Sequence, residues 1–197
     1  GDKMKIVLVV LALVGSSMGL IFNRECPSHA VHEDLDIDQY QGTWYEYRRY
    51  ETSEQSGSDC ATFEYYPIDG DSMKLISRWV YIEDNFRELY RNGTVSRAAG
   101  AGSASRFNLV FNDEPNRNIN YHILATNYYS FSLVWSCHNI GGGQSNEDAW
   151  VLSKVPNPDA DEFEQYVGEY IDRYLVRENL RGTVQGFEHC TGIGETL

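Results

Sequence analysis

The chain contains 197 residues, which is enough for one domain with a sizeable buried core. It is rich in aromatic side chains, with 14 Tyr, 8 Phe and 4 Trp, as β-barrels and binding cavities often are. The formal net charge of −13 at pH 7 argues against nucleic acids and anionic membranes as partners, because binding to both is driven by Lys and Arg.

Residues 4–19 have the pattern of a secretory signal. Met4 and Lys5 precede an apolar run over residues 6–14, and mostly small residues follow over residues 15–19. The run is too short to cross a membrane as a helix. We therefore expect residues 1–20 to be this signal segment with a few extra N-terminal residues. Residues 21–197 should form a single secreted domain without a membrane span.

Four cysteines lie far apart in the chain, at Cys26, Cys60, Cys137 and Cys190. In a secreted protein such cysteines usually form disulfides, and their wide spacing excludes a compact Cys-x-x-Cys zinc or redox motif. Four cysteines allow three pairings, and the spacing alone does not choose among them. We expect disulfides here and no metal site.

From Gly42 onward the sequence indicates a series of short strands separated by turns. Gly42 opens an aromatic run with strong β propensity, with Trp44 near its start. Turn residues follow over 69–71, 112–116 and 141–143. Eight closely spaced strands without helices between them predict an all-β fold, an antiparallel up-and-down β-barrel. The predicted strands cover residues 42–50, 60–66, 73–82, 86–95, 106–111, 119–125, 128–138 and 148–155.

One helix is predicted after the eighth strand. Asn157 suits the N-cap, Pro158 suits the first helical position, and acidic residues follow at the positive end of the helix dipole. The polar face is acidic rather than basic, so we expect the apolar face to pack on the barrel and not on a membrane surface. The apolar and aromatic stripe consists of Phe163, Tyr166, Val167, Tyr170, Ile171 and Tyr174.

Three motifs, in this order, resemble those of the lipocalin family. Gly42-Thr43-Trp44-Tyr45 matches the first motif, and Thr126-Asn127-Tyr128 resembles the second, with Asn in place of Asp. Trp150-Val151-Leu152-Ser153-Lys154 resembles the third, with Lys in place of Arg. The resemblance covers residues 26–190 and implies a lipocalin calyx with one C-terminal helix outside. It implies structural roles for Gly42, Trp44, Thr126, Tyr128 and Lys154.

Within the family, the resemblance is to the group of insect bilin carriers and apolipoprotein D. This group shares the Cys26-Pro27 pair before the first strand and the Trp135-Ser136-Cys137 segment. Its disulfide pattern, first with third and second with fourth, implies the pairs Cys26–Cys137 and Cys60–Cys190. We expect Asn127 still to bond within its turn and Lys154 still to stack over Trp44.

Alternation along each strand divides its side chains between the barrel interior and the outside. On residues 128–138 we assign the serine side to the interior, because the outer wall must receive the helix and Cys137 must face the N-terminal segment. The same parity turns Ile119, Ile123 and Asp148 inward. Core packing is the alternative for each Phe, Leu and Ile. The predicted ligand contacts are Leu75, Ser77, Trp79, Leu89, Arg91, Phe107, Leu109, Phe111, Tyr121, Val134, Ser136, His138 and Trp150.

An eight-stranded barrel can enclose one small ligand. We therefore predict a non-enzymatic, secreted carrier of one small lipophilic molecule. The group resemblance implies a linear tetrapyrrole such as biliverdin and a role in coloration, with Arg91 or His138 meeting its carboxylates. Retinoids, carotenoids, fatty acids and pheromones are alternative cargoes. An isomerase with a free inward cysteine and a protein-binding lipocalin with a filled interior are alternatives of other classes.

Asn92-Gly93-Thr94 is an N-glycosylation sequon, and strand parity turns Asn92 outward. Glycosylation at this position is therefore expected in a secreted protein. A homo-oligomer is left open, since coloured lipocalins often form oligomers but no self-complementary patch stands out in the sequence.

Overall fold

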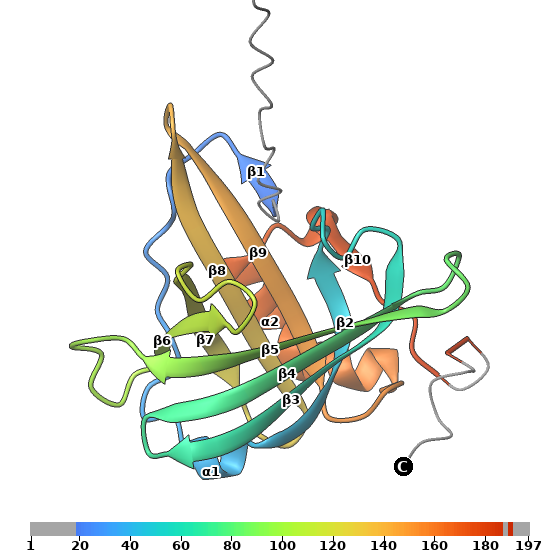
Figure 1. Ribbon diagram of the computed structural model, residues 1–197, viewed down its shortest axis with the longest axis horizontal. Coiled ribbons are helices and arrows are strands. Elements are labelled where there is room, and N and C mark those ends of the chain that lie inside the picture. The colour runs from blue at the N-terminus through green and yellow to red at the C-terminus, as the bar shows by residue number, and fades with distance from the viewer. Residues whose placement is uncertain (1–18, 187–188, 191–197) are drawn as a thin grey trace, which may run out of the picture.

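The computed structural model describes residues 19–186 and 189–190 and is built around a closed antiparallel β-barrel (Figure 1). Eight strands follow one another in sequence order, and β9 pairs with β2 to close the barrel. The predicted eight-stranded barrel is therefore confirmed. Its strands are β2 (Gly42–Tyr50), β3 (Ser58–Asp69), β4 (Ser72–Tyr81), β5 (Arg87–Arg97), β6 (Arg106–Phe111), β7 (Ile119–Thr126), β8 (Phe131–Gly141) and β9 (Gln144–Ser153).

Two short strands extend the sheet beyond the barrel strands. β1 (Leu20–Phe22) pairs with β9 where β9 has left β2, and β10 (Leu180–Gly182) pairs with β2 where β2 has left β3. Leu20, which we assigned to the signal segment, thus takes part in the sheet, whereas residues 1–18 lie outside the described residues. The short helix α1 (Ile37–Tyr40) and the 3-10 helix η1 (Arg177–Asn179) complete the elements.

β8 begins at Phe131, three residues later than predicted, because the preceding residues form a turn. The side-chain oxygen of Asn127 accepts hydrogen bonds from the backbone N–H groups of residues 129–131 at 2.8 to 3.2 Å. Tyr128 has a φ of 67°, and Thr126 Oγ1 donates to the carbonyl of Phe131 at 2.8 Å. The turn role expected for Asn127 is confirmed, and it delays the start of the strand.

Two other strands extend at one end at least three residues beyond their predicted bounds. β3 continues through Pro67 to Asp69, because β2 pairs with β3 only up to Tyr65 and leaves this part of β3 at an edge, where proline is tolerated. β9 begins at Gln144 because the β8–β9 ladder continues to the glycine turn over residues 142–143.

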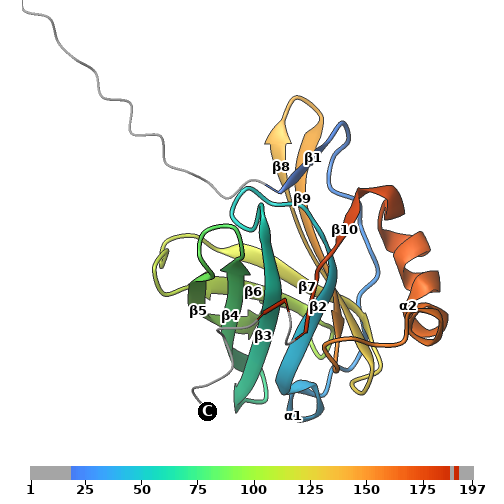
Figure 2. The ribbon, with the colours of Figure 1, turned by 90° about the vertical axis from the view of Figure 1, so that its right-hand side faces the viewer.

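Helix α2 (Ala160–Tyr174) packs on the outside of the barrel (Figure 2). Its N-cap is Asp159, whose side chain accepts the N–H of Glu162 at 2.9 Å, so the prediction of Asn157 as the N-cap and Pro158 as the first helical residue is wrong. A carboxylate binds the free N–H groups and the positive helix end more strongly than an amide does. Among the described residues, no helix is long and apolar enough to cross a membrane.

The barrel wall separates two apolar layers. The inner layer includes Val134 of β8, whereas Leu133 and Trp135 belong to an outer layer together with Phe163 and Val167 of α2. The assignment of the serine side of β8 to the interior is therefore confirmed. Tyr166 of the predicted helix stripe is exposed, so the buried stripe is narrower than predicted.

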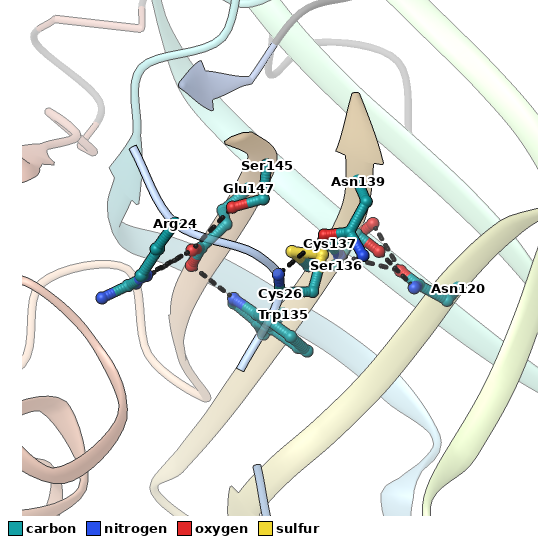
Figure 3. Close-up of a disulfide and its surroundings, with 9 residues drawn as sticks. All are labelled: Arg24, Cys26, Asn120, Trp135, Ser136, Cys137, Asn139, Ser145 and Glu147. Carbon is teal, nitrogen blue, oxygen red and sulfur yellow. Dashed lines mark hydrogen bonds and ion pairs between the residues drawn. A yellow bond between two sulfur atoms is a disulfide. The ribbon is translucent and has the colours of Figure 1, made fainter. Parts of the chain in front are cut away.

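Both disulfides pair as the family resemblance implies, Cys26 with Cys137 and Cys60 with Cys190. Figure 3 shows the first of them, which ties the N-terminal segment to β8. Beside it, Arg24 Nη2 donates to Glu147 Oε1 at 2.8 Å and Trp135 Nε1 donates to Glu147 Oε2 at 3.0 Å. The Glu147 side chain is fully buried, and these donors offset the cost of burying its charge.

The closed end of the barrel carries the first and third family motifs. Trp44 is fully buried, and its Nε1 donates to the carbonyl of Tyr40 at 2.9 Å. Lys154 Nζ lies 4.0 Å from the centroid of the Trp44 ring and donates to the carbonyl of Gln41 at 2.8 Å, which confirms the expected stacking. Gly42 has a φ of 92°, a conformation that favours glycine where the chain enters β2.

Candidate ligand-binding site

A largely apolar cavity, the calyx cavity, lies inside the barrel toward its mouth. We call the mouth the barrel end opposite Trp44, where the loops over residues 51–57 and 112–118 lie. The cavity has a volume of about 60 Å³. Eight of the predicted ligand contacts line it, namely Leu75, Ser77, Trp79, Arg91, Leu109, Phe111, Tyr121 and Trp150.

The remaining predicted contacts lie elsewhere. Phe107 and Val134 are fully buried in the inner apolar layer, where they pack as core residues. Leu89 is half-buried and lies opposite Trp79 in the β4–β5 ladder. Ser136 and His138 line a second, polar space described below. For Phe107 and Val134 the alternative interpretation, packing in the core, is therefore the one that the structure supports.

Hydrogen-bonded tyrosines occupy the barrel interior on the side of the closed end. Tyr65 and Tyr121 share a hydrogen bond between their hydroxyls at 2.5 Å, and the hydroxyl of Tyr40 pairs with Ser132 Oγ at 2.7 Å. Burial raises the pKa of the Tyr65 and Tyr121 hydroxyls above the usual value. These groups are therefore neutral at physiological pH, and Tyr121 presents an uncharged surface to the cavity.

The loop over residues 51–57 is held across the mouth by a buried polar network. Trp150 Nε1 donates to Gln55 Oε1 at 3.1 Å, and Gln55 Nε2 donates to Glu46 Oε2 at 3.1 Å. Arg49, which is fully buried, donates to Glu46 at 2.7 Å and to the backbone carbonyls of Gln55 and Ser58 at 2.7 and 3.1 Å. The network therefore fixes the loop that lines the cavity at its mouth.

Arg91 faces the calyx cavity near the mouth, as predicted, and its side chain is only 5% exposed. The guanidinium contacts three carboxylates, those of Glu54 at 3.2 Å, Asp113 at 2.9 Å and Glu114 at 2.7 Å. It also lies 3.8 Å from the centroid of the Phe111 ring. The hydrogen-bonding capacity of Arg91 is thus directed to protein carboxylates on two loops.

A second, polar space of about 400 Å³ lies beside the calyx cavity. Ser136 and His138 line it, and it shares Arg117, Ile119 and Asp148 with the calyx cavity. It adjoins a stretch where the β7–β8 ladder has ended and Asn120 bridges the strands instead. Asn120 Oδ1 accepts hydrogen bonds from Ser136 Oγ at 3.0 Å and from the backbone N–H of Cys137 at 2.8 Å (Figure 3).

Two carboxyl groups at the mouth have raised pKa values. Loss of solvent raises the pKa of Asp148 to about 7, with Glu54 raising it further and Arg117 lowering it. Burial also raises the pKa of Glu54, against the opposing effect of Arg91. Within the described part of the chain, no three His, Cys, Asp or Glu side chains are placed to hold a metal ion.

Four cavity residues come from loops and were not predicted from the sequence. Thr52, Glu54 and Gln55 lie in the loop after β2, and Arg117 lies just before β7. Nothing in the local sequence pattern places these loops over the barrel. Phe63 was missed on a strand, where strand parity on β3 contained the signal that it faces inward.

Comparisons with known proteins agree with the geometry. The family model described as a lipocalin-like domain matches residues 35–184. Apolipoprotein D from Cavia porcellus is 28% identical over 165 residues, which cover 78% of this chain and 79% of that protein. The bilin-binding protein of Pieris brassicae is 25% identical over 150 residues, which cover 75% of this chain and 77% of that protein.

A solved structure has the same architecture. The structure of insecticyanin from the tobacco hornworm Manduca sexta superposes with a TM-score of 0.71 and covers 87% of this chain and 92% of that chain. The two sequences are 19% identical in this comparison, and the match therefore shows a common fold.

Proposed function

This chain belongs to the lipocalin family, and on that premise we propose that it is a secreted carrier that encloses one small lipophilic molecule in its calyx. The main observation in support is the cavity inside the barrel, which is lined by aromatic and aliphatic side chains with a few polar groups. Such a site holds a ligand by removing its apolar surface from water, while the polar groups orient it.

A linear tetrapyrrole such as biliverdin is the first candidate ligand, with a role in coloration. The similarity to the bilin-binding protein of Pieris brassicae supports this candidate. In the cavity, Trp79, Phe111, Tyr121 and Trp150 offer ring faces and edges to a conjugated ligand. Retinoids, carotenoids, fatty acids and pheromones are the alternative cargoes, since the same apolar lining suits them.

Binding of a molecule of this size requires the mouth to open. The calyx cavity has about 60 Å³, whereas pockets for small molecules usually measure roughly 300–1,000 Å³. Trp79, Phe111 and Arg91 border the cavity, and their side chains would have to turn outward to admit the ligand. The adjoining polar space of about 400 Å³ would then receive the more polar end of the ligand.

The small cavity also favours a second candidate function, that of a lipocalin with a filled interior that binds other proteins. The side chains of Tyr65 and Tyr121, which are joined by a hydrogen bond, fill part of the barrel interior. An isomerase that depends on a free thiol finds no support, because all four cysteines form disulfides.

Secretion and glycosylation are part of the proposal. The two disulfides and the apolar N-terminal run support an extracellular location, as does the exposed position of Asn92 in β5 for its glycan. Expression in secretory cells, with a mobility shift on enzymatic deglycosylation that Asn92→Gln abolishes, would test both. A homo-oligomer stays a prediction, which sedimentation analysis would check.

The carrier function is tested by titrating the secreted protein with biliverdin. We expect a shifted and sharpened red absorption band, together with tryptophan quenching that saturates at one ligand per chain, because Trp79 and Trp150 line the cavity. Retinol, a carotenoid and a fatty acid form the comparison panel. Saturable binding of another lipophile alone would replace the bilin, and failure of every ligand would favour the filled-interior candidate.

A further inference from the structure

The charge at the mouth of the calyx bears on which ligands can enter it. The side chain of Arg91 is only 5% exposed and lines the cavity. A buried cation in this position would normally be a candidate anchor for an anionic ligand. Its donors, however, already contact Glu54, Asp113 and Glu114. A ligand carboxylate would have to displace one of these groups and leave a protein carboxylate without its partner.

The charged groups around the mouth are unequal in number. Arg91 and Arg117 are the two cations that line the calyx cavity, and Arg117 itself lies 3.3 Å from Glu114. Four carboxyl groups oppose them: those of Glu54, Asp113 and Glu114, which contact Arg91, and that of Asp148, whose pKa of about 7 leaves it partly protonated near neutral pH. Glu54 and Glu114 are 30% and 33% exposed, so water screens them only in part, whereas Asp113 is 63% exposed and contributes less.

These observations oppose an anionic head group for physical reasons. A carboxylate entering the mouth would meet a site with an excess of negative charge and limited screening, and a whole protein with a formal charge of −13 repels it on approach. An alcohol, ester or amide head group accepts hydrogen bonds without adding charge, and an amine would be attracted.

We infer that the acidic mouth of the calyx selects uncharged or cationic lipophiles over lipophilic carboxylates of the same shape. This inference rests on the proposed carrier function, and it ranks the uncharged alternative cargoes, such as retinol and carotenoids, above biliverdin, which carries carboxylates. It assigns Glu54, Asp113 and Glu114 as residues that determine specificity, because they occupy Arg91 and supply the opposing charge.

Matched ligand pairs test the inference on the secreted protein. Biliverdin is compared with its dimethyl ester, and retinoic acid with retinol, by tryptophan quenching at pH 7.5 (about physiological). We expect the neutral member of each pair to bind roughly tenfold or more tightly. Equal affinities, or tighter binding of the acids, would overturn the inference while leaving the carrier function intact. If no member of either pair binds and the carotenoid and the fatty acid of the panel also fail, the carrier function itself fails and the inference with it. Binding of the fatty acid alone would overturn the inference.

A charge-neutralising variant tests the assigned cause. In Asp113→Asn/Glu114→Gln the amides keep the size of the side chains but free Arg91 from two negative partners. We expect the preference for neutral ligands to shrink to within roughly threefold, mainly through tighter binding of the acids. Glu33→Gln/Asp38→Asn removes the same charge at exposed positions on the side of the closed end, so it is the matched control and should keep the wild-type preference. An unchanged preference in Asp113→Asn/Glu114→Gln would show that the cluster is not the cause.

Discussion

Gln55 and Trp150 are joined by a hydrogen bond at the mouth of the calyx, although they are 95 positions apart in the chain. Through Gln55 the loop over residues 51–57 is tied both to β9 and to the buried pair formed by Glu46 and Arg49. The polar network that positions this loop therefore borders the space proposed for the ligand.

Replacing Gln55 by Leu should destabilise the protein. The change leaves the indole N–H of Trp150 and a carboxylate oxygen of Glu46 without this partner in a buried region. We expect the free energy of unfolding to fall by about 1–3 kcal/mol. Urea unfolding measures it, with the exposed helix residue Gln165 replaced by Leu as a control that changes stability by less than about 0.5 kcal/mol. Equal stability of the two variants would contradict the role of the network.

Removing Arg24 should expose the cost of burying Glu147. Arg24→Ala takes away two hydrogen bonds to a fully buried carboxylate, which keeps Trp135 as a donor. We expect a loss of about 1–3 kcal/mol in urea unfolding. Adding Glu147→Gln to this variant should recover part of the loss, because an amide is cheaper to bury than a charge. A double variant less stable than Arg24→Ala alone would argue against this explanation.

Asp148 should make stability fall as the pH rises. Its pKa is about 7 in the folded protein, above the value of about 3.9 for an unfolded Asp. The folded state therefore binds the proton more tightly, and its advantage is present at low pH and lost between about pH 4 and 7. Relative to wild type, Asp148→Asn should gain stability from pH 5 to pH 8 (roughly this titration range) in urea unfolding. A difference that stays constant with pH would refute the assignment.

Filling the calyx cavity should block binding without disturbing the fold. Ser77 lines the cavity and is 2% exposed, so Ser77→Leu adds apolar volume where the ligand would lie. We expect at least a roughly tenfold loss of affinity for the best ligand of the panel. Lys74→Leu, at an exposed position on the same strand, serves as the control and should bind normally. Circular dichroism checks that both variants fold, and normal binding by a folded Ser77→Leu would place the ligand elsewhere.

The alternation of side chains along each strand predicted many of the residues that line the cavity. Side chains alternate strictly along a strand, so Leu75, Ser77 and Trp79 were correctly predicted to share the interior face. β8 was harder, because its apolar side faces α2 rather than the cavity. The family resemblance and the position of Cys137 were needed to turn its serine side inward, which the structure confirms.

The partners of Arg91 were beyond the reach of the sequence. Glu54 lies in the loop after β2, and Asp113 and Glu114 lie in the turn after β6, so they meet Arg91 only when the barrel closes. Spacing along the chain contains no sign of such a contact. The helix start was missed for a different reason, since Asn157 and Asp159 are both good capping residues and the choice depends on the stronger acceptor.

The most direct test of the carrier function is native mass spectrometry of the protein isolated from its own source tissue. We predict a complex that exceeds the mass of the chain by one small lipophilic molecule, and release of that molecule when the barrel is unfolded in denaturant. Analysis of the released molecule would then identify the cargo and its charge. A bare chain, together with no saturable binding of any lipophile in the titrations, would contradict the account and point to a barrel that acts through its outer surface.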